Sequence, residues 1–317
     1  MVRLTRMLTA VIMLMVPLMI LTPAASSAGG LGIPTSQAGL GFGNLKNFTG
    51  VRFNLVDRGV HRVGGLNITL WIPKDNKYAV YQGISLGFVG HQAGVTQGVA
   101  AALIGLAGGD YQGLALGGIG IGADNIQGFS AALIGIGAKD IQGVALGGIG
   151  VGAHDVQGIA AGLIGVGLHD MTGLAFGGLG VGGKDMTGMA VGGLGVGGNE
   201  MKGIFLGGLG VGGDDLTGIF LGGLGVGGNN LTGLMAGLGA VGGQNIEGAA
   251  LALGYLKGES LTGLGMGAYN NVRETTGLSI GIFNRAEVLN GIQIGLLNHA
   301  GNNPRGLQWL PGINAHF

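Results

Sequence analysis

The chain of 317 residues has no cysteine, six prolines, 5% aromatic residues and 9% charged residues. Without cysteine there are no disulfides and no lipid attachment through a cysteine. The scarcity of proline and the lack of a Gly-X-Y period exclude collagen. Lys and Arg number 15, as do Asp and Glu, so the net charge is zero. That balance predicts no nucleic-acid partner and no partner chosen by opposite charge.

The first 28 residues have the three parts of a secretory signal. Arg3 and Arg6 supply the positive start, residues 7–21 form an apolar run, and residues 26–28 are small. The run is shorter than the roughly 20 residues that a spanning helix needs. We therefore expect residues 1–28 to be a signal peptide and the protein to be exported. Residues 29–50 are expected to be a glycine-rich linker or plug, followed by one β-repeat domain over residues 51–317.

Glycine is abundant, with 77 residues, and it marks a tandem repeat. A phase-marking glycine recurs every 15 residues, with regular units over residues 98–276 and variant units over residues 277–317. The regular markers are Gly98, Gly113, Gly128, Gly143, Gly158, Gly173, Gly188, Gly203, Gly218, Gly233, Gly248 and Gly263. So many glycines make a helix unfavourable, at about 1 kcal/mol each relative to alanine. The unit predicts an all-β fold.

Two β architectures suit a 15-residue unit. In a parallel β-solenoid each unit is one coil, and equivalent positions stack on one another. In an antiparallel meander each unit is one strand and a turn, and environments alternate every two units. Large and small residues do alternate at the fourth and sixth positions, in the pairs Ala101/Leu103, Leu116/Gly118, Ala131/Leu133, Leu146/Gly148, Ala161/Leu163 and Phe176/Gly178. The alternation favours the meander, because it would match cross-strand neighbours.

From Gly98 to Glu247 every Asp, Glu and Lys lies in a short polar segment between apolar stretches. Uncharged stretches of about 9–11 residues suit strands that span a bilayer, where only a closed barrel satisfies the backbone. Three strands before the array (near residues 51–56, 65–72 and 83–89) and fifteen within it predict a β-barrel of about 18 strands. The lack of polar side chains for a lumen counts against a barrel. The parallel β-solenoid stays open as the alternative.

The C-terminal units resemble a family. Gly277 to Ala286 (GLSIGIFNRA) and Gly291 to Ala300 (GIQIGLLNHA), with Leu66 to Trp71 (LNITLW) and Leu310 to Asn314 (LPGIN), resemble surface-repeat proteins of spirochaetes and bacteroidetes. The similarity covers roughly residues 50–317. It implies an exported bacterial envelope protein and brings no catalytic residues with it.

No catalytic, cofactor-binding or metal-binding residue is predicted. The pair Asp214 and Asp215 invites a calcium site, but Asp and Asn are ordinary turn residues and the ligand spacing of aspartate-rich β-rolls is absent. His154 and His169 occupy equivalent positions in consecutive units. In a meander these positions fall at opposite ends of the sheet, so solvated turn histidines are expected.

These observations predict a non-catalytic outer-membrane or cell-surface protein, structural or pore-forming, with the lipid bilayer as partner. The alternative function is a secreted β-solenoid that acts as an adhesin or binds ice or another surface. No cofactor and no small-molecule substrate are indicated, and the sequence does not give the oligomeric state.

Overall fold

The computed structural model describes residues 29–317, so the predicted signal peptide, residues 1–28, lies outside the described residues. The described part is all-β and is built from 23 strands. The strands before the regular units are β1 (Gly30–Pro34), β2 (Ala38–Gly43), β3 (Asn47–Asn54), β4 (Arg62–Thr69) and β5 (Val80–Gly87). The next strands are β6 (Gly90–Ala102), β7 (Gly105–Gly117), β8 (Gly120–Ala132), β9 (Gly135–Gly147), β10 (Gly150–Gly162), β11 (Gly165–Gly177), β12 (Gly180–Gly182), β13 (Asp185–Gly192) and β14 (Gly195–Gly207). The last are β15 (Gly210–Gly222), β16 (Gly225–Gly227), β17 (Asn230–Gly237), β18 (Ala240–Ala252), β19 (Tyr255–Met266), β20 (Tyr269–Ile280), β21 (Phe283–Ala286), β22 (Val288–Ala300) and β23 (Trp309–His316).

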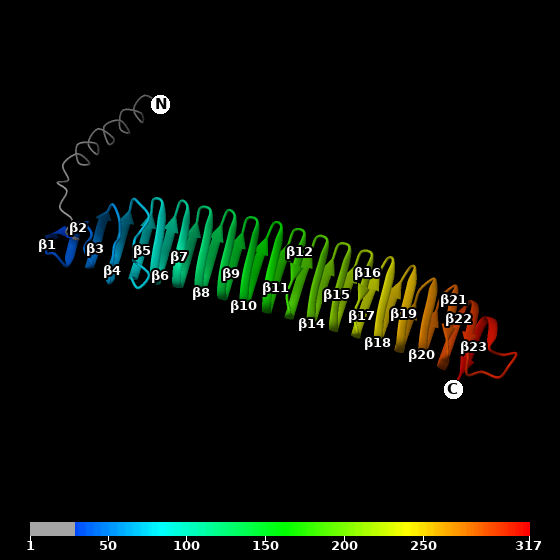
Figure 1. Ribbon diagram of the computed structural model, residues 1–317. Helices are drawn as coiled ribbons and strands as arrows, with labels where there is room; N and C mark the ends of the chain where they lie inside the picture. Colours follow the sequence, from blue (N-terminus) through cyan, green and yellow to red (C-terminus); the bar gives the residue numbers. More distant parts are fainter. Residues whose placement is uncertain (1–28) are drawn as a thin grey trace, which may run out of the picture.

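The repeats stack in parallel, and each coil lies beside the one before it along the long axis of the molecule (Figure 1). In the pairing of β14 with β15, Gly203 faces Gly218 and Leu206 faces Leu221, each partner being 15 residues further on. The antiparallel meander and its closure as a barrel are therefore wrong. The alternative is confirmed, a β-solenoid of about 18 turns. Each repeat of the sequence forms one coil, with β1 and β23 at opposite ends of the stack (Figure 1).

Both ends of the stack are covered by an antiparallel strand. β1 pairs antiparallel with β2, which then pairs parallel with β3. At the other end β23 pairs antiparallel with β22. The N-terminal segment expected to be a linker or plug thus joins the sheet as β1 and β2. Because an open edge is a template for pairing with other chains, the reversed strands limit end-to-end growth of the stack.

The coil Gly203–Thr217 shows the cross-section, with the marker glycine as position 1. Positions 3, 5, 9 and 14 point inward, and in this coil they hold Phe205, Gly207, Val211 and Leu216. The three large side chains are at most 3% exposed. Because coils stack in register, each inward position builds a column along the solenoid, as where the Phe205 and Phe220 rings stack 5.3 Å apart. The core therefore consists of a few columns of apolar side chains that run along the solenoid and are enclosed by the backbone of the stacked coils.

The marker glycine lies at a bend of the coil that other residues cannot adopt. From Gly98 to Gly263 its φ lies between +116° and +136°. A Cβ at Gly188 would lie 2.1 Å from the carbonyl oxygen of Gly173 in the preceding coil. The repeat therefore requires glycine here for both backbone angle and space.

The alternation of large and small residues has a different cause from cross-strand matching. At position 6, Gly118 donates its N–H to the Ala102 carbonyl, whereas Leu133 donates to the Gly118 carbonyl one residue further along. A Cβ at Gly118 would lie 1.7 Å from the Leu103 carbonyl oxygen. The corner thus has two backbone forms, and only one of them admits a side chain. Where alternate coils use alternate forms, the 30-residue pattern results.

The variant C-terminal coils replace part of the apolar core with asparagine. Leu256 of the regular column is in register with Asn270, which is followed by Asn284 and Asn298 at 14-residue steps. Asn270 Nδ2 donates to Asn284 Oδ1 at 2.6 Å, and Asn284 Nδ2 donates to Asn298 Oδ1 at 2.7 Å. These amides are at most 1% exposed. The buried Nδ2 groups are tolerated because the next coil supplies an acceptor for each of these two, while Asn270 Oδ1, at the start of the row, has no partner.

We expect Gly188→Ala to lower the free energy of unfolding by about 1–3 kcal/mol, because alanine is strained at positive φ and collides with the preceding coil. The matched control is Gly182→Ala, six residues earlier, where nothing lies within 4 Å of an added Cβ. The control should change stability by less than about 1 kcal/mol. Urea unfolding followed by circular dichroism measures both variants. Equal losses would contradict the bend at position 1.

Candidate functional site

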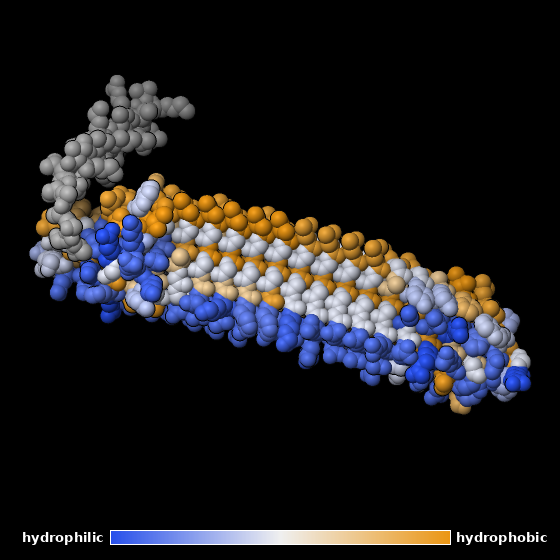
Figure 2. Space-filling model, viewed as in Figure 1, coloured by the Kyte–Doolittle hydropathy of each residue, from blue (hydrophilic) through white to orange (hydrophobic). Residues whose placement is uncertain are grey.

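One long edge of the solenoid is apolar and the opposite edge is polar (Figure 2). We define the apolar edge as positions 4, 6 and 7 of the regular coils. Position 7 carries an unbroken ladder of branched side chains that are between 47% and 63% exposed, namely Ile104, Ile119, Ile134, Ile149, Ile164, Leu179, Leu194, Leu209 and Leu224. Neighbours in the ladder are one coil apart, about 4.8 Å. Sequence reasoning missed this ladder, although its signal, a branched residue after Gly-Gly or Leu in each unit, is present.

A groove follows positions 4 to 6 beside this ladder. Its first part, about 1300 Å³, extends from Ile68 to Gly193, and a second part of about 720 Å³ extends from Val191 to Met266. None of the described residues that line either part is charged. Leu133 and Leu163 stand out from the lining, at 77% and 78% exposed. The alternating residues of the sequence therefore lie on the surface of the molecule, as a row of projections beside glycines.

The opposite edge, defined as positions 12, 13 and 15, holds every charged residue from Gly98 to Glu247 (Figure 2). The sequence correctly separates these charges from the apolar stretches, but they lie at a corner of each coil and not in hairpin turns. Position 15 adds a ladder of Gln and Thr, in which Gln82 donates to Gln97 at 2.8 Å and Gln97 donates to Gln112 at 3.1 Å. Lys202 and Glu247 interrupt this ladder.

The candidate calcium residues Asp214 and Asp215 are hydrogen-bonded to the next coil. Asn229 Nδ2 donates to Asp214 Oδ1 at 3.0 Å, and Asn230 Nδ2 donates to Asp215 Oδ1 at 2.6 Å. The two nearly identical repeats differ at these positions for a physical reason, since stacked carboxylates would repel one another and amides do not. Each aspartate has an amide donor as its partner.

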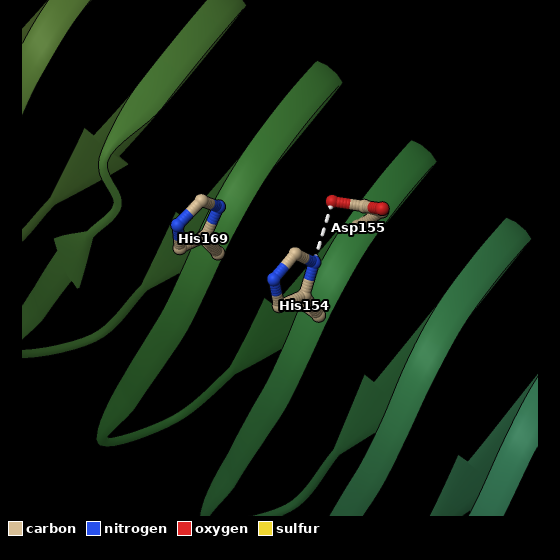
Figure 3. A group of neighbouring side chains, drawn as sticks. All are labelled: His154, Asp155 and His169. Carbon is tan, nitrogen blue, oxygen red and sulfur yellow. Dashed lines mark hydrogen bonds and ion pairs between the residues drawn. The ribbon is translucent and has the colours of Figure 1, made fainter.

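The stack brings His154 and His169 together (Figure 3). Their rings are 4.3 Å apart between centroids and nearly parallel, at 11°. The expectation that they lie at opposite ends of a sheet is wrong, because it followed from the antiparallel topology. His154 Nδ1 lies 2.9 Å from Asp155 Oδ1, within hydrogen-bonding distance.

A buried polar network fills part of the core near β3 to β5, beside the stacked apolar side chains of Phe48, Val63 and Tyr81. Arg52 is fully buried and its guanidinium contacts Asp57 and the Leu45 carbonyl. Asp57 also accepts hydrogen bonds from Thr69 at 2.6 Å and Tyr81 at 2.8 Å. Burial raises the pKa of Asp57, but the Arg52 charge and these hydrogen bonds outweigh it and leave the pKa below its usual value. The network is saturated internally, which is typical of a structural role.

His91 lies next to this network and begins the position 9 column. It is 5% exposed, and its ring packs 5.0 Å from that of Tyr81. Burial lowers the pKa of His91 to about 4. The next residue in the column is Leu106, which faces His91 across the coil interface. The same column position therefore holds a leucine in the next coil.

In the described part of the chain, no helix is long and apolar enough to cross a membrane. The fold and its surface define a parallel β-solenoid whose cross-section is amphipathic. Comparisons with protein-family models, curated proteins and solved structures each find no match. The resemblance to bacterial surface-repeat proteins stays a prediction.

The buried His91 predicts that stability falls as the pH falls. A histidine with a lowered pKa in the folded state is protonated first in the unfolded chain, so its cost is absent above about pH 6.5 and grows towards pH 4. We expect this residue to lower the free energy of unfolding by about 2 kcal/mol at pH 5 relative to pH 7.

The matched variant is His91→Leu, which places in this coil the side chain that the next coil has. In urea unfolding, the free energy of unfolding of this variant should equal that of wild type at pH 7 and should lack the decrease of about 2 kcal/mol at pH 5. The same pH profile in wild type and variant would contradict a buried neutral His91.

Proposed function

We propose that the protein is an exported, non-catalytic β-solenoid that lies on a lipid bilayer surface, with its apolar edge in contact with lipid. The observation that carries the proposal is the separation of the two edges. Half-exposed branched side chains line one edge, and the charges lie along the other. The largest apolar patch of an ordinary soluble monomer is a few hundred Å² and is often an interaction site. An apolar ladder along nine coils is far more extended.

The backbone is compatible with contact with lipid. The N–H groups of the apolar corner donate to carbonyls of the preceding coil, where Ile119 donates to the Ile104 carbonyl at 2.6 Å and Ile134 donates to the Ile119 carbonyl at 2.8 Å. A backbone placed against hydrocarbon must have such internal partners. The arrangement suits an element that lies in the interface with its polar side in water.

The charge balance favours neutral lipid as the binding surface. The net charge is zero and the charges lie away from the apolar edge, so binding would depend on apolar contact and would be insensitive to salt. The sequence features of residues 1–28 support export. A second copy of the chain is a competing occupant of the apolar edge, and the experiment below separates the two.

The test is flotation of the purified protein with neutral phosphatidylcholine vesicles in a density gradient. The variant I134K/I149K/I164K places three charges on the apolar edge. Each isoleucine is about half exposed, and losing their burial should lower the partition coefficient at least about 30-fold. The control Q142K/Q157K/T172K adds the same charge to the same three coils on the polar edge and should float like wild type.

Wild-type protein that stays at the bottom of the gradient would contradict the proposal. So would wild-type behaviour of the apolar-edge variant. A concentration-dependent dimer in analytical ultracentrifugation, lost in that variant and unaffected by vesicles, would assign the apolar edge to self-association.

A second candidate function is binding to ice or another regular solid, supported by the exposed Gln and Thr ladder at position 15. Its side chains repeat at the coil spacing of about 4.8 Å. The interruptions at Lys202 and Glu247 make it less regular than the apolar ladder. Thermal hysteresis measures this candidate, and the variant Q142K/Q157K/T172K should abolish it without changing flotation.

A further inference from the structure

A row of six carboxylates follows position 13 along the charged edge, independently of the apolar edge. In-register pairing places Asp140, Asp155, Asp170, Asp185, Glu200 and Asp215 in consecutive coils. Neighbours in the row are about 4.8 Å apart along the stack. Like charges at this spacing repel one another, so the row needs positive charge close to it.

Lysines at position 12 supply positive charge in the coil before, and in the coil after, the two coils of Asp155 and Asp170. Lys139 precedes Asp140 and pairs with Asp124 at 2.6 Å, and Lys184 lies 3.9 Å from Asp185. In the two coils between them, position 12 holds His154 and His169. These two coils therefore have no lysine at position 12. Asp155 and Asp170 are therefore the carboxylates of this row whose coils have histidine where the flanking coils have lysine.

The two imidazole rings stack 4.3 Å apart across the boundary between the two coils. In addition, His169 Nδ1 and Asp170 Oδ1 lie 2.9 Å apart, yet both atoms are buried and neither has an aligned hydrogen-bond partner. A single cation that accepts nitrogen and oxygen ligands would bind both imidazoles and the Asp155 carboxylate together.

The three side chains in Figure 3 have the reach for such a cation. One ligand atom from each of His154, Asp155 and His169 lies within 4.8 Å of the other two. Zinc binds histidine nitrogen and carboxylate oxygen at about 2.0–2.2 Å, so small side-chain rotations bring the three atoms to one ion. The side chains of His154 and Asp155 are 60% and 50% exposed, which leaves access from solvent.

We propose that His154, His169 and Asp155 bind one divalent transition-metal ion of the zinc class, which clips β10 to β11. Two imidazoles and one carboxylate are a ligand set that zinc, nickel and copper accept, whereas calcium and magnesium prefer oxygen ligands. The ion supplies the positive charge that the lysines supply in the flanking coils. A water molecule completes the coordination.

Isothermal titration of the purified full chain with zinc chloride tests the site. Wild type should bind one ion saturably, and its melting temperature should rise with zinc. His154→Gln and His169→Gln should each weaken zinc binding at least about tenfold, since even the partners of metal ligands contribute 10–100-fold. Asp155→Asn should weaken it in the same direction. The control His61→Gln removes an exposed histidine from β3–β4 and should bind zinc like wild type.

The repeat also allows the site to be transplanted. Asp214 and Asn229 occupy position 12 of two later coils, and Asp215 follows Asp214 as Asp155 follows His154. The double variant D214H/N229H should therefore bind a second zinc ion, and D214H alone should not. Circular dichroism confirms that each variant keeps its β-structure. Wild type without saturable zinc binding, or His154→Gln and His169→Gln with wild-type affinity, would overturn the proposal.

Discussion

The structure depends on one constraint, the in-register parallel hydrogen bonding of each coil to the coil before it, which in the regular units is 15 residues earlier. This pairing places every side chain about 4.8 Å from the side chain at the equivalent position. Because equivalent side chains of successive coils are in contact, a residue type that recurs at one position must pack against itself. The constraint explains the apolar columns of the core, and it explains why the marker glycine is required in every regular coil, where its φ is positive and the preceding carbonyl is close.

The same constraint acts on the surface. Apolar side chains at position 7 become a continuous ladder, while carboxylates at position 13 become a row of like charge that needs compensation. Compensation takes several forms along the charged edge, with lysine at Lys139 and an amide at Asn229. In the two histidine coils, the proposed metal ion compensates the carboxylates. A surface of this kind is a product of repetition, because one residue per unit determines a whole edge.

The sequence was sufficient for the repeat, its period, the all-β class and the separation of charges from apolar stretches. The direction of neighbouring strands could not be predicted, since parallel and antiparallel stacks share the same 15-residue pattern. The alternation of Leu116 with Gly118 was misinterpreted as cross-strand matching. The glycine at position 6 is instead required because a Cβ at Gly118 would lie 1.7 Å from the Leu103 carbonyl oxygen, a distance that depends on the backbone of the corner. The error in direction also separated His154 from His169, which the structure stacks.

The register of the stack is tested most directly by disulfide formation between exposed threonines. Thr217 and Thr232 face each other in adjacent coils. The double variant T217C/T232C should form an intramolecular disulfide under mild oxidation, since the coil spacing lies in the range of Cα distances that a disulfide spans. The variant T187C/T217C, two coils apart at about 9.6 Å, should not. Failure of the first pair to crosslink in folded protein, or equal crosslinking of both pairs, would contradict the parallel stack.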